Sequence, residues 1–467
     1  MKTILLLLSA IAAFATAQAQ ELRLAPDSLR QVQAQARQQQ KPLLVLIAPP
    51  PSPANLPKAI QKSRSQSGLN EPEVVQVLNQ DFLVKEIRFG SREGAPLVRQ
   101  YTITSYPTYL YFAPDGALLY RRFGNASAAA PYLKDIAAAR QALADPHNLS
   151  YYQAEYERGN RTVDFLQQYL TKRRQLGQVV EPALLDTYAD QLPAKAFDRA
   201  ADVQFILELG PVVGSRAYRL SHLNNKLIDS LYRVLPLSQR QAMNNLMIAR
   251  TMSQAIATRN QNMAQEGANF ARGTWNNDPL RGARAYENNM LDFYRLTKDT
   301  TNYLRQSSWF YERYYMNIST DSARKALAAY EAQQQEQVAS RQRLLANGGR
   351  PPGVAPGAPT MIATTVRRSG PAPDFVNELN TGAWNVYLTG TRNRDYLSRA
   401  VQWSKRTVDL TPRAAYYDTL AHLLYRLRFF AEAEAMQQQA VAHAAPEGMS
   451  PQQFEQVLTK MKKHQPL

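Results

Sequence analysis

The sequence predicts a small α/β domain near the N-terminus, followed by a mostly α-helical region. Three features of the 467-residue chain indicate this organisation. Lys41 to Ile47 is mainly a short apolar run, typical of a strand buried on both faces. Residues 108–124 have the strand, tight turn and strand pattern of a β-hairpin. From Tyr151 onward, apolar residues recur at helical spacing and strand signals are few.

Residues 1–19 have the pattern of a secretory signal peptide. An early lysine precedes an apolar core, and Ala17 and Ala19 are spaced as a cleavage site. We therefore expect an exported protein that works in the periplasm or outside the cell. The apolar core is shorter than the roughly 20 residues that span a membrane, and no later run approaches that length. We expect no transmembrane segment in the mature chain.

The elements of the α/β domain follow one another in residues 21–144. A Gln-rich helical stretch precedes the strand at Lys41–Ile47. The patterns then predict a helix at Glu71–Leu78 with Asn70 as N-cap, a strand at Phe82–Phe89, a helix at Pro96–Tyr101 and a closing helix at Tyr132–Leu143. In the closing helix, we expect Ala137, Ala138, Ala139 and Leu143 to face the sheet.

The hairpin follows the motif Tyr106-Pro107-Thr108. Proline cannot donate to a strand ladder, so Pro107 belongs at a strand start. The first strand is then Tyr109–Phe112, and Pro114-Asp115-Gly116 supplies the turn before the chain returns at Leu118–Phe123.

This order of elements and the Tyr-Pro-Thr motif resemble the thioredoxin-like family over residues 21–144. The resemblance implies that the Tyr106–Pro107 bond is cis, an isomer that costs only about 0.5–1 kcal/mol before proline. It also implies that Lys41–Ile47 is the central strand. In a register without gaps, Ser52 and Asn55 then stand where redox-active members carry their two cysteines.

The chain contains no cysteine. Thiol exchange requires a thiolate, and neither a hydroxyl nor a carboxamide can replace it, so thiol–disulfide oxidoreductase chemistry is excluded for this polypeptide alone. A catalytic Ser52 would need a nearby base, and all five histidines lie outside residues 21–144. His422 and His443 share one repeat, but no third ligand is spaced to complete a metal site. We therefore expect no catalytic residue, no metal, no cofactor and no enzymatic activity.

Basic residues outnumber acidic ones, with 55 Lys and Arg against 38 Asp and Glu and a net charge of +17. The charge is spread along the chain and forms only short clusters such as Lys172-Arg173-Arg174. This favours a solvated basic surface, with weak contact to a polyanion or a membrane surface as the alternative. We find no basic patch interleaved with aromatic residues and expect no specific nucleic-acid binding.

Residues 145–346 read as a helical domain. Amphipathic stripes are broken by Gly and Pro. The last helix, Ser322–Leu345, is rich in Ala, Gln and Arg, and we expect it to project into solvent. Residues 347–374 are rich in Pro and Gly, which predicts a flexible linker or long loop. We expect helical hairpins at 375–467.

These hairpins resemble the tetratricopeptide repeat. Matching small or apolar residues lie 33 apart, and two prolines lie 34 apart; the pairs are Ala400 and Ala433, Thr407 and Ala440, Tyr387 and Leu420, and Pro412 and Pro446. Within the second copy, the family's packing positions fall on Leu420, Ala421, Leu424, Ala433 and Ala440. Because two copies seldom form a stable solenoid alone, we expect them to stack on the preceding helices.

The sequence thus predicts a secreted, non-catalytic protein that binds proteins or peptides or acts as a scaffold. The groove beside the expected cis proline would be lined by Ser52, Asn55, Tyr106, Pro107 and Thr108. The alternative is a non-catalytic subunit or chaperone in an envelope thiol–disulfide oxidoreductase or stress pathway. Only the alternative predicts a preference for unfolded or cysteine-containing clients. A hydrolase in the helical half is disfavoured, because no nucleophile, base and orienting group are spaced for it.

Overall fold

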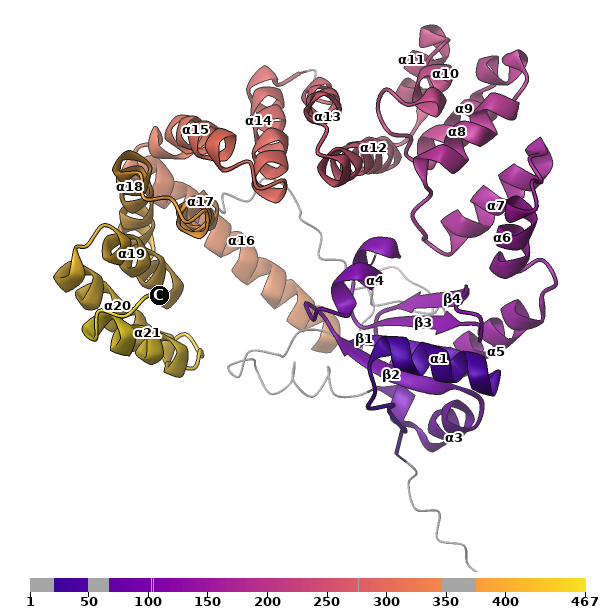
Figure 1. Ribbon diagram of the computed structural model, residues 1–467, viewed down its shortest axis with the longest axis horizontal. Coiled ribbons are helices and arrows are strands. Elements are labelled where there is room, and N and C mark those ends of the chain that lie inside the picture. The colour runs from indigo at the N-terminus through magenta and orange to yellow at the C-terminus, as the bar shows by residue number, and fades with distance from the viewer. Residues whose placement is uncertain (1–20, 49–66, 102, 104, 276, 347–374) are drawn as a thin grey trace, which may run out of the picture. The chain divides into compact units, whose positions relative to one another are not determined.

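The computed structural model describes residues 21–48, 67–101, 103, 105–275, 277–346 and 375–467. These residues divide into two compact units, which we call the N-terminal unit, up to residue 152, and the helical unit, from residue 153 on. A small mixed sheet in the first and helices throughout the described part of the second confirm the predicted layout (Figure 1). The predicted leader at 1–19 and the predicted linker at 347–374 lie outside the described residues.

The N-terminal unit is built on four strands in the order β2-β1-β3-β4. Their bounds are Leu43–Ala48 for β1, Leu83–Arg88 for β2, Thr108–Phe112 for β3 and Leu118–Phe123 for β4. β1 pairs with β2 in parallel, while β3 pairs antiparallel with both β1 and β4. The first five residues of β1 are buried, as the apolar run predicted. This arrangement is compatible with the thioredoxin-like expectation.

Helices cover both faces of this sheet. Their bounds are Leu29–Gln39 for α1, Pro72–Asp81 for α3, Gly94–Gln100 for α4 and Ala130–Ala144 for α5, with α6 at Leu149–Glu157 running into the helical unit. On one face, Leu44, Tyr109 and Tyr111 share a core cluster with α3 and α5. Val45 and Ile47 alternate with Leu44 along the strand, so they face the other side, and they are fully buried there.

Two local predictions in this unit were wrong. Asn70 belongs to a short 3₁₀ turn, Gly68–Asn70, and the N-cap of α3 is Glu71. In α5, Tyr132, Ile136 and Ala139 face the core. Ala137 and Leu143 are exposed, because the buried stripe of α5 follows the two larger side chains and not the run of alanines.

The helical unit contains a series of short helices, α7 to α15, joined by tight connections. Their bounds are Val163–Gln175 for α7, Pro182–Gln191 for α8, Ala200–Glu208 for α9, Arg216–Ser221 for α10, Asn225–Val234 for α11, Leu237–Thr258 for α12, Gln261–Gly273 for α13, Pro279–Leu296 for α14 and Thr300–Tyr311 for α15. A 3₁₀ turn at Ala194–Asp198 lies between α8 and α9. None of the described helices is long and apolar enough to cross a membrane.

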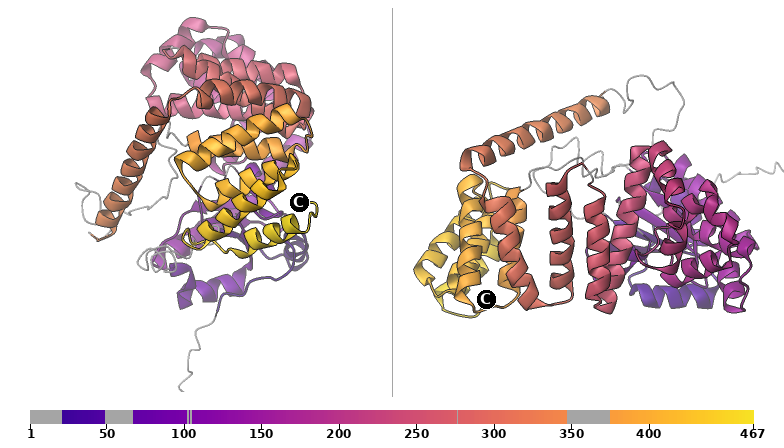
Figure 2. Two further views of the ribbon diagram at one scale, coloured as in Figure 1. Left: turned by 90° about the vertical axis from the view of Figure 1, so that its left-hand side faces the viewer. Right: turned by 90° about the horizontal axis from the view of Figure 1, so that it is seen from above.

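The C-terminal part adds six helices. They are α16 at Thr320–Ala346, α17 at Phe375–Leu388, α18 at Arg394–Leu410, α19 at Ala414–Arg426, α20 at Phe430–Ala444 and α21 at Gln452–Lys462. Both views of Figure 2 show the far half of α16 apart from the other helices of this unit. Ala400, Ala421, Ala433 and Ala440 are fully buried, as expected for small residues where two helices touch.

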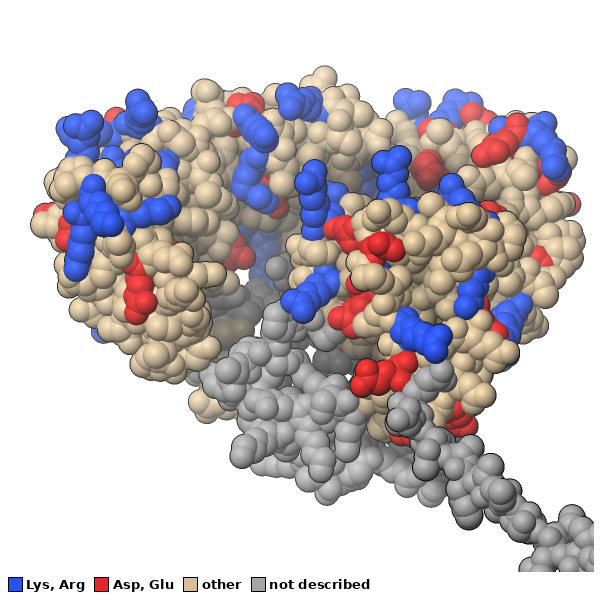
Figure 3. All heavy atoms as spheres, turned by 60° about the horizontal axis from the view of Figure 1, so that its bottom comes forward, with Lys and Arg blue, Asp and Glu red and all other residues tan. Residues whose placement is uncertain are grey.

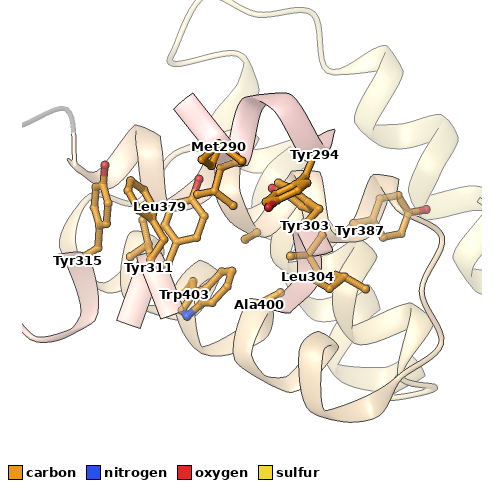
Figure 4. Close-up of a cluster of buried hydrophobic side chains, with 14 of the residues drawn as sticks. Met290, Tyr294, Tyr303, Leu304, Tyr311, Tyr315, Leu379, Tyr387, Ala400 and Trp403 are labelled. Carbon is orange, nitrogen blue, oxygen red and sulfur yellow. The ribbon is translucent and has the colours of Figure 1, made fainter. Parts of the chain in front are cut away.

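One core joins the C-terminal hairpins to the helices before residue 347. Side chains from α14 and α15 pack with others from α17 and α18 in a single cluster. Figure 4 shows Tyr311 of α15 facing Trp403 of α18, and their ring centroids lie 4.9 Å apart. Residues 375–427 are therefore not an independent appendage of the chain.

A π-helical turn at Glu312–Met316 strengthens this junction. Trp403 donates its indole N–H to the Glu312 carboxylate over 3.3 Å, and Arg399 lies 3.5 Å from the same carboxylate. Arg406 donates to the main-chain carbonyls of Met316, which ends the turn, and of Ile318 beyond it. Partners on α18 thus satisfy the polar groups that end α15.

Candidate functional site

The candidate site lies at the end of the sheet where β1 and β2 finish and β3 begins. We call this end of the sheet, which carries Pro107, the proline edge. Because β1 and β2 are parallel and β3 is antiparallel, the ends of β1 and β2 and the start of β3 share that edge. The Phe89 N–H donates to the Ala48 carbonyl over 3.1 Å, and the Gly124 N–H donates to the Pro107 carbonyl over 2.8 Å. These bonds fix the position of Pro107 relative to its neighbours.

The Tyr106–Pro107 peptide bond is cis, which confirms the expectation from the motif. Thr108, the first residue of β3, is fully buried, and its Oγ1 donates to the Ser105 carbonyl over 2.5 Å. Thr108 therefore holds the turn before the strand and does not offer its hydroxyl to a ligand. Tyr106 and Pro107 are half-buried and remain accessible.

The main chain of Tyr106 has no partner among the described residues. Its N–H and carbonyl form no hydrogen bond there, whereas the carbonyls of Ser105 and Pro107 on either side are both engaged. A donor and an acceptor on one residue, just before the start of a strand, can pair with an extended segment of another chain.

The ring of Tyr106 packs against the ring of Phe89. The two ring centroids lie 4.5 Å apart with the planes tilted by 53°, and burial raises the pKa of the Tyr106 hydroxyl. Phe89 nevertheless remains 42% exposed. The sequence pattern predicted Phe89 as the end of a strand and did not mark it as a site residue. The signal that could have identified it is its place between Arg88, where β2 ends, and Gly90, which has a φ of +79° and turns the chain away.

A network of hydrogen bonds positions the segment that follows β4, next to this end of the sheet. Tyr132 of α5 donates its hydroxyl to Asn125 Oδ1 over 2.5 Å and accepts from the Ala126 N–H over 3.0 Å. Ser67 donates to the same Asn125 oxygen over 2.8 Å. Tyr109 lies 3.3 Å from the Tyr132 hydroxyl, and burial raises the pKa of Tyr109 strongly. The network connects the chain after β4 to α5 and to Ser67, the N-cap of the 3₁₀ turn at Gly68–Asn70.

The remaining predicted site residues, Ser52 and Asn55, lie outside the described residues. The structure therefore brings together Tyr106, Pro107 and Thr108 only. Across the parts of the chain that the structure describes, no three His, Asp or Glu side chains are grouped to hold a metal ion. His422 lies against Trp384 and Tyr387, with ring centroids 5.2 and 5.1 Å away, which are packing contacts.

Charged side chains are interspersed on the face shown in Figure 3. Lys and Arg are scattered there among uncharged residues, and Asp and Glu lie between them. Several basic groups are paired, such as Arg173 with Glu181 over 2.7 Å and Arg216 with Asp190 over 2.7 Å. This distribution favours a solvated basic surface on that face over a continuous polyanion-binding patch.

No family model and no curated protein matches this chain. The geometry offers a main-chain donor and acceptor at Tyr106 that no described residue engages, an aromatic pair in which Phe89 is exposed and Tyr106 half-buried, and a cis proline. It can bind an extended segment, and the described residues there include no group with the chemistry of a thiol.

Proposed function

We propose that this protein is an exported, non-catalytic thioredoxin-fold protein that binds protein or peptide segments. The observation that carries the proposal is a cis proline preceded by Tyr106, whose main-chain groups no described residue engages, in a chain that has no cysteine. The edge supports recognition of an extended segment, and the missing thiol removes the chemistry that would otherwise follow.

The strand order and the helices on both faces support the thioredoxin-like assignment of the N-terminal unit. In the helical unit, buried alanines at the contacts of α17 to α20 support a tetratricopeptide-like assignment. Stacked helical hairpins present an extended surface, and we assign them a second binding or scaffold role.

Photo-cross-linking in the full chain without its predicted leader tests this proposal. A photoreactive amino acid replaces Tyr106 in one variant and Trp309 in another, because Trp309 is 69% exposed on α15 in the helical unit. Each variant is irradiated with the envelope fraction of the source organism. We expect discrete adducts at position 106 that excess unmodified protein competes away.

The cross-linking variants keep the whole chain for a structural reason. Deleting residues 375–467 to remove the helical hairpins would expose the core that they share with α14 and α15. Adducts at position 309 alone would place binding in the helical unit and contradict a role for the proline edge. Adducts at position 106 that consist only of unfolded or cysteine-rich clients would favour the chaperone or oxidoreductase-subunit alternative.

A further inference from the structure

The edge that holds the cis proline combines exposed aromatic surface with arginines that form no ion pair with a described residue. We call this set the Phe89 edge and define it as Arg88, Phe89, Arg92, Tyr106 and Pro107. Phe89 and Tyr106 supply the aromatic surface. Arg88 ends β2, Arg92 lies in the turn that follows it, and both are exposed.

The ring of Phe89 is placed to receive an apolar side chain. Its ring centroid lies 4.5 Å from that of Tyr106, yet 42% of the residue stays exposed. An aromatic residue held in position by a neighbour loses little conformational entropy on binding, and such residues dominate the affinity of many interfaces.

The segment that carries this ring has more basic than acidic residues. The connection from Arg88 to Pro107 carries Arg88, Arg92 and Arg99 against one acidic residue, Glu93. The Oε1 of Glu93 accepts the Leu29 N–H over 3.1 Å, which holds this carboxylate at the start of α1. None of the three arginines forms an ion pair with a described carboxylate. Their positive charge is therefore available to a partner.

We infer that the Phe89 edge selects an acidic, extended protein segment that carries an aromatic or large aliphatic side chain. The inference rests on the proposed peptide binding and adds the chemistry of the partner. The segment's main chain pairs with Tyr106, its apolar side chain lies on Phe89, and its carboxylates meet Arg88 and Arg92. A second copy of this chain fits poorly, because each copy carries a net charge of +17.

The test is a fluorescence-anisotropy titration of the full chain without its leader. The probe is a labelled nine-residue peptide that alternates Glu and Thr around a central Phe, and its counterpart has Lys in place of every Glu. We expect the acidic peptide to bind at least about tenfold more tightly than the basic one. Phe89→Ala should weaken the acidic peptide by about tenfold, and Phe89→Leu should weaken it less.

The double variant Arg88→Gln, Arg92→Gln should bind the acidic peptide about fivefold more weakly and lose most of the dependence on salt. Its matched control is Lys462→Gln, Lys463→Gln, which removes the same charge from exposed positions at the end of α21 and just after it and should leave affinity unchanged. If both double variants lost the same affinity for the acidic peptide, the effect would come from net charge alone. That result would overturn the inference.

Two outcomes separate this inference from the proposed function. If the acidic and basic peptides bind equally and Phe89→Ala weakens both, peptide binding stands and the acidic selectivity is wrong. If neither peptide binds, while the photoreactive group at position 106 still captures envelope proteins, the inference fails and the proposed function survives. Tighter binding of a single-stranded oligonucleotide than of the acidic peptide would also overturn it.

Discussion

Gly382 of α17 lies directly against the ring of Tyr311 in α15, so closely that a Cβ at Gly382 would fall 2.3 Å from the Tyr311 Cζ. Tyr311 also faces Trp403, and the three residues join α15, α17 and α18 (Figure 4). Only a residue without a side chain lets α17 approach this closely. The contact links the C-terminal hairpins to the rest of the helical unit.

Gly382→Ala should therefore destabilise the helical unit by about 2 kcal/mol, because overpacking outweighs the better helix propensity of alanine. All four tryptophans lie in the helical unit, so tryptophan fluorescence during urea unfolding reports on that unit. Gly273→Ala is the matched control, since a Cβ there meets no atom within 4 Å. Equal stability of the two variants would mean that α15 and α17 do not pack as described.

The N-terminal unit depends on a buried ion pair between Arg122 of β4 and Asp135 of α5. Their side chains are 15% and 7% exposed, the closest atoms lie 2.7 Å apart, and Tyr120 donates its hydroxyl to the other oxygen of Asp135 over 3.0 Å. Asp135→Ala would leave a buried guanidinium unpaired and should cost about 3–5 kcal/mol. Hydrogen exchange of the β3 and β4 amides measures this loss.

Adding Arg122→Met to Asp135→Ala should recover part of that stability, because it removes the stranded charge. Asp81→Ala serves as the control, since its partner Arg140 is mostly exposed and such a pair contributes only about 0–1 kcal/mol. A loss for Asp81→Ala as large as that for Asp135→Ala would contradict this account.

His222 should make the helical unit less stable in mild acid. Burial lowers the pKa of its imidazole, although the hydrogen bond between Nδ1 and the Tyr218 carbonyl partly opposes this. Between the two pKa values the unfolded chain binds more protons than the folded chain, so this contribution is complete above about pH 6.5 and is lost as the pH falls. In His222→Gln, the tryptophan-detected unfolding midpoint should depend less on pH between about 7 and 5. His147→Gln, at an exposed position, should keep the dependence of the parent protein.

Buried tyrosines predict a second loss at alkaline pH. Burial raises the pKa of Tyr188 and of Tyr232 to about 12, so the folded unit keeps protons that the unfolded chain releases from about pH 10 upward. This contribution is intact below about pH 10 and falls as the pH rises toward 12. Tyrosinate absorbance in a pH titration should show a delayed, cooperative phase that coincides with unfolding. In Tyr188→Phe that phase should lose amplitude, and simple titration of all tyrosines near their ordinary pKa would contradict the prediction.

Local patterns predicted much of the N-terminal fold because its elements depend on nearby residues. The apolar run of β1 and the hairpin turn each follow from a few adjacent positions, and the cis bond before Pro107 was implied by the resemblance to the thioredoxin-like family. The face of α5 was misjudged, since it depends on which side chains the sheet accepts. Phe89 was missed for a related reason. The residue that its ring contacts, Tyr106, is distant in the sequence, so the pair is visible only in the folded structure. The contact of Gly382 with Tyr311 is equally non-local.

Amide hydrogen exchange of the full chain, without its leader, tests the central claim most directly. The probe is an unfolded, cysteine-free acidic polypeptide, compared with buffer alone. Binding at the proline edge predicts slower exchange in the segments that contain residues 88–92 and 105–108, and no such change in a Tyr106→Pro variant, which lacks the Tyr106 N–H and its ring. Protection confined to helices beyond residue 152, or equal protection in that variant, would contradict the claim that this edge binds the partner.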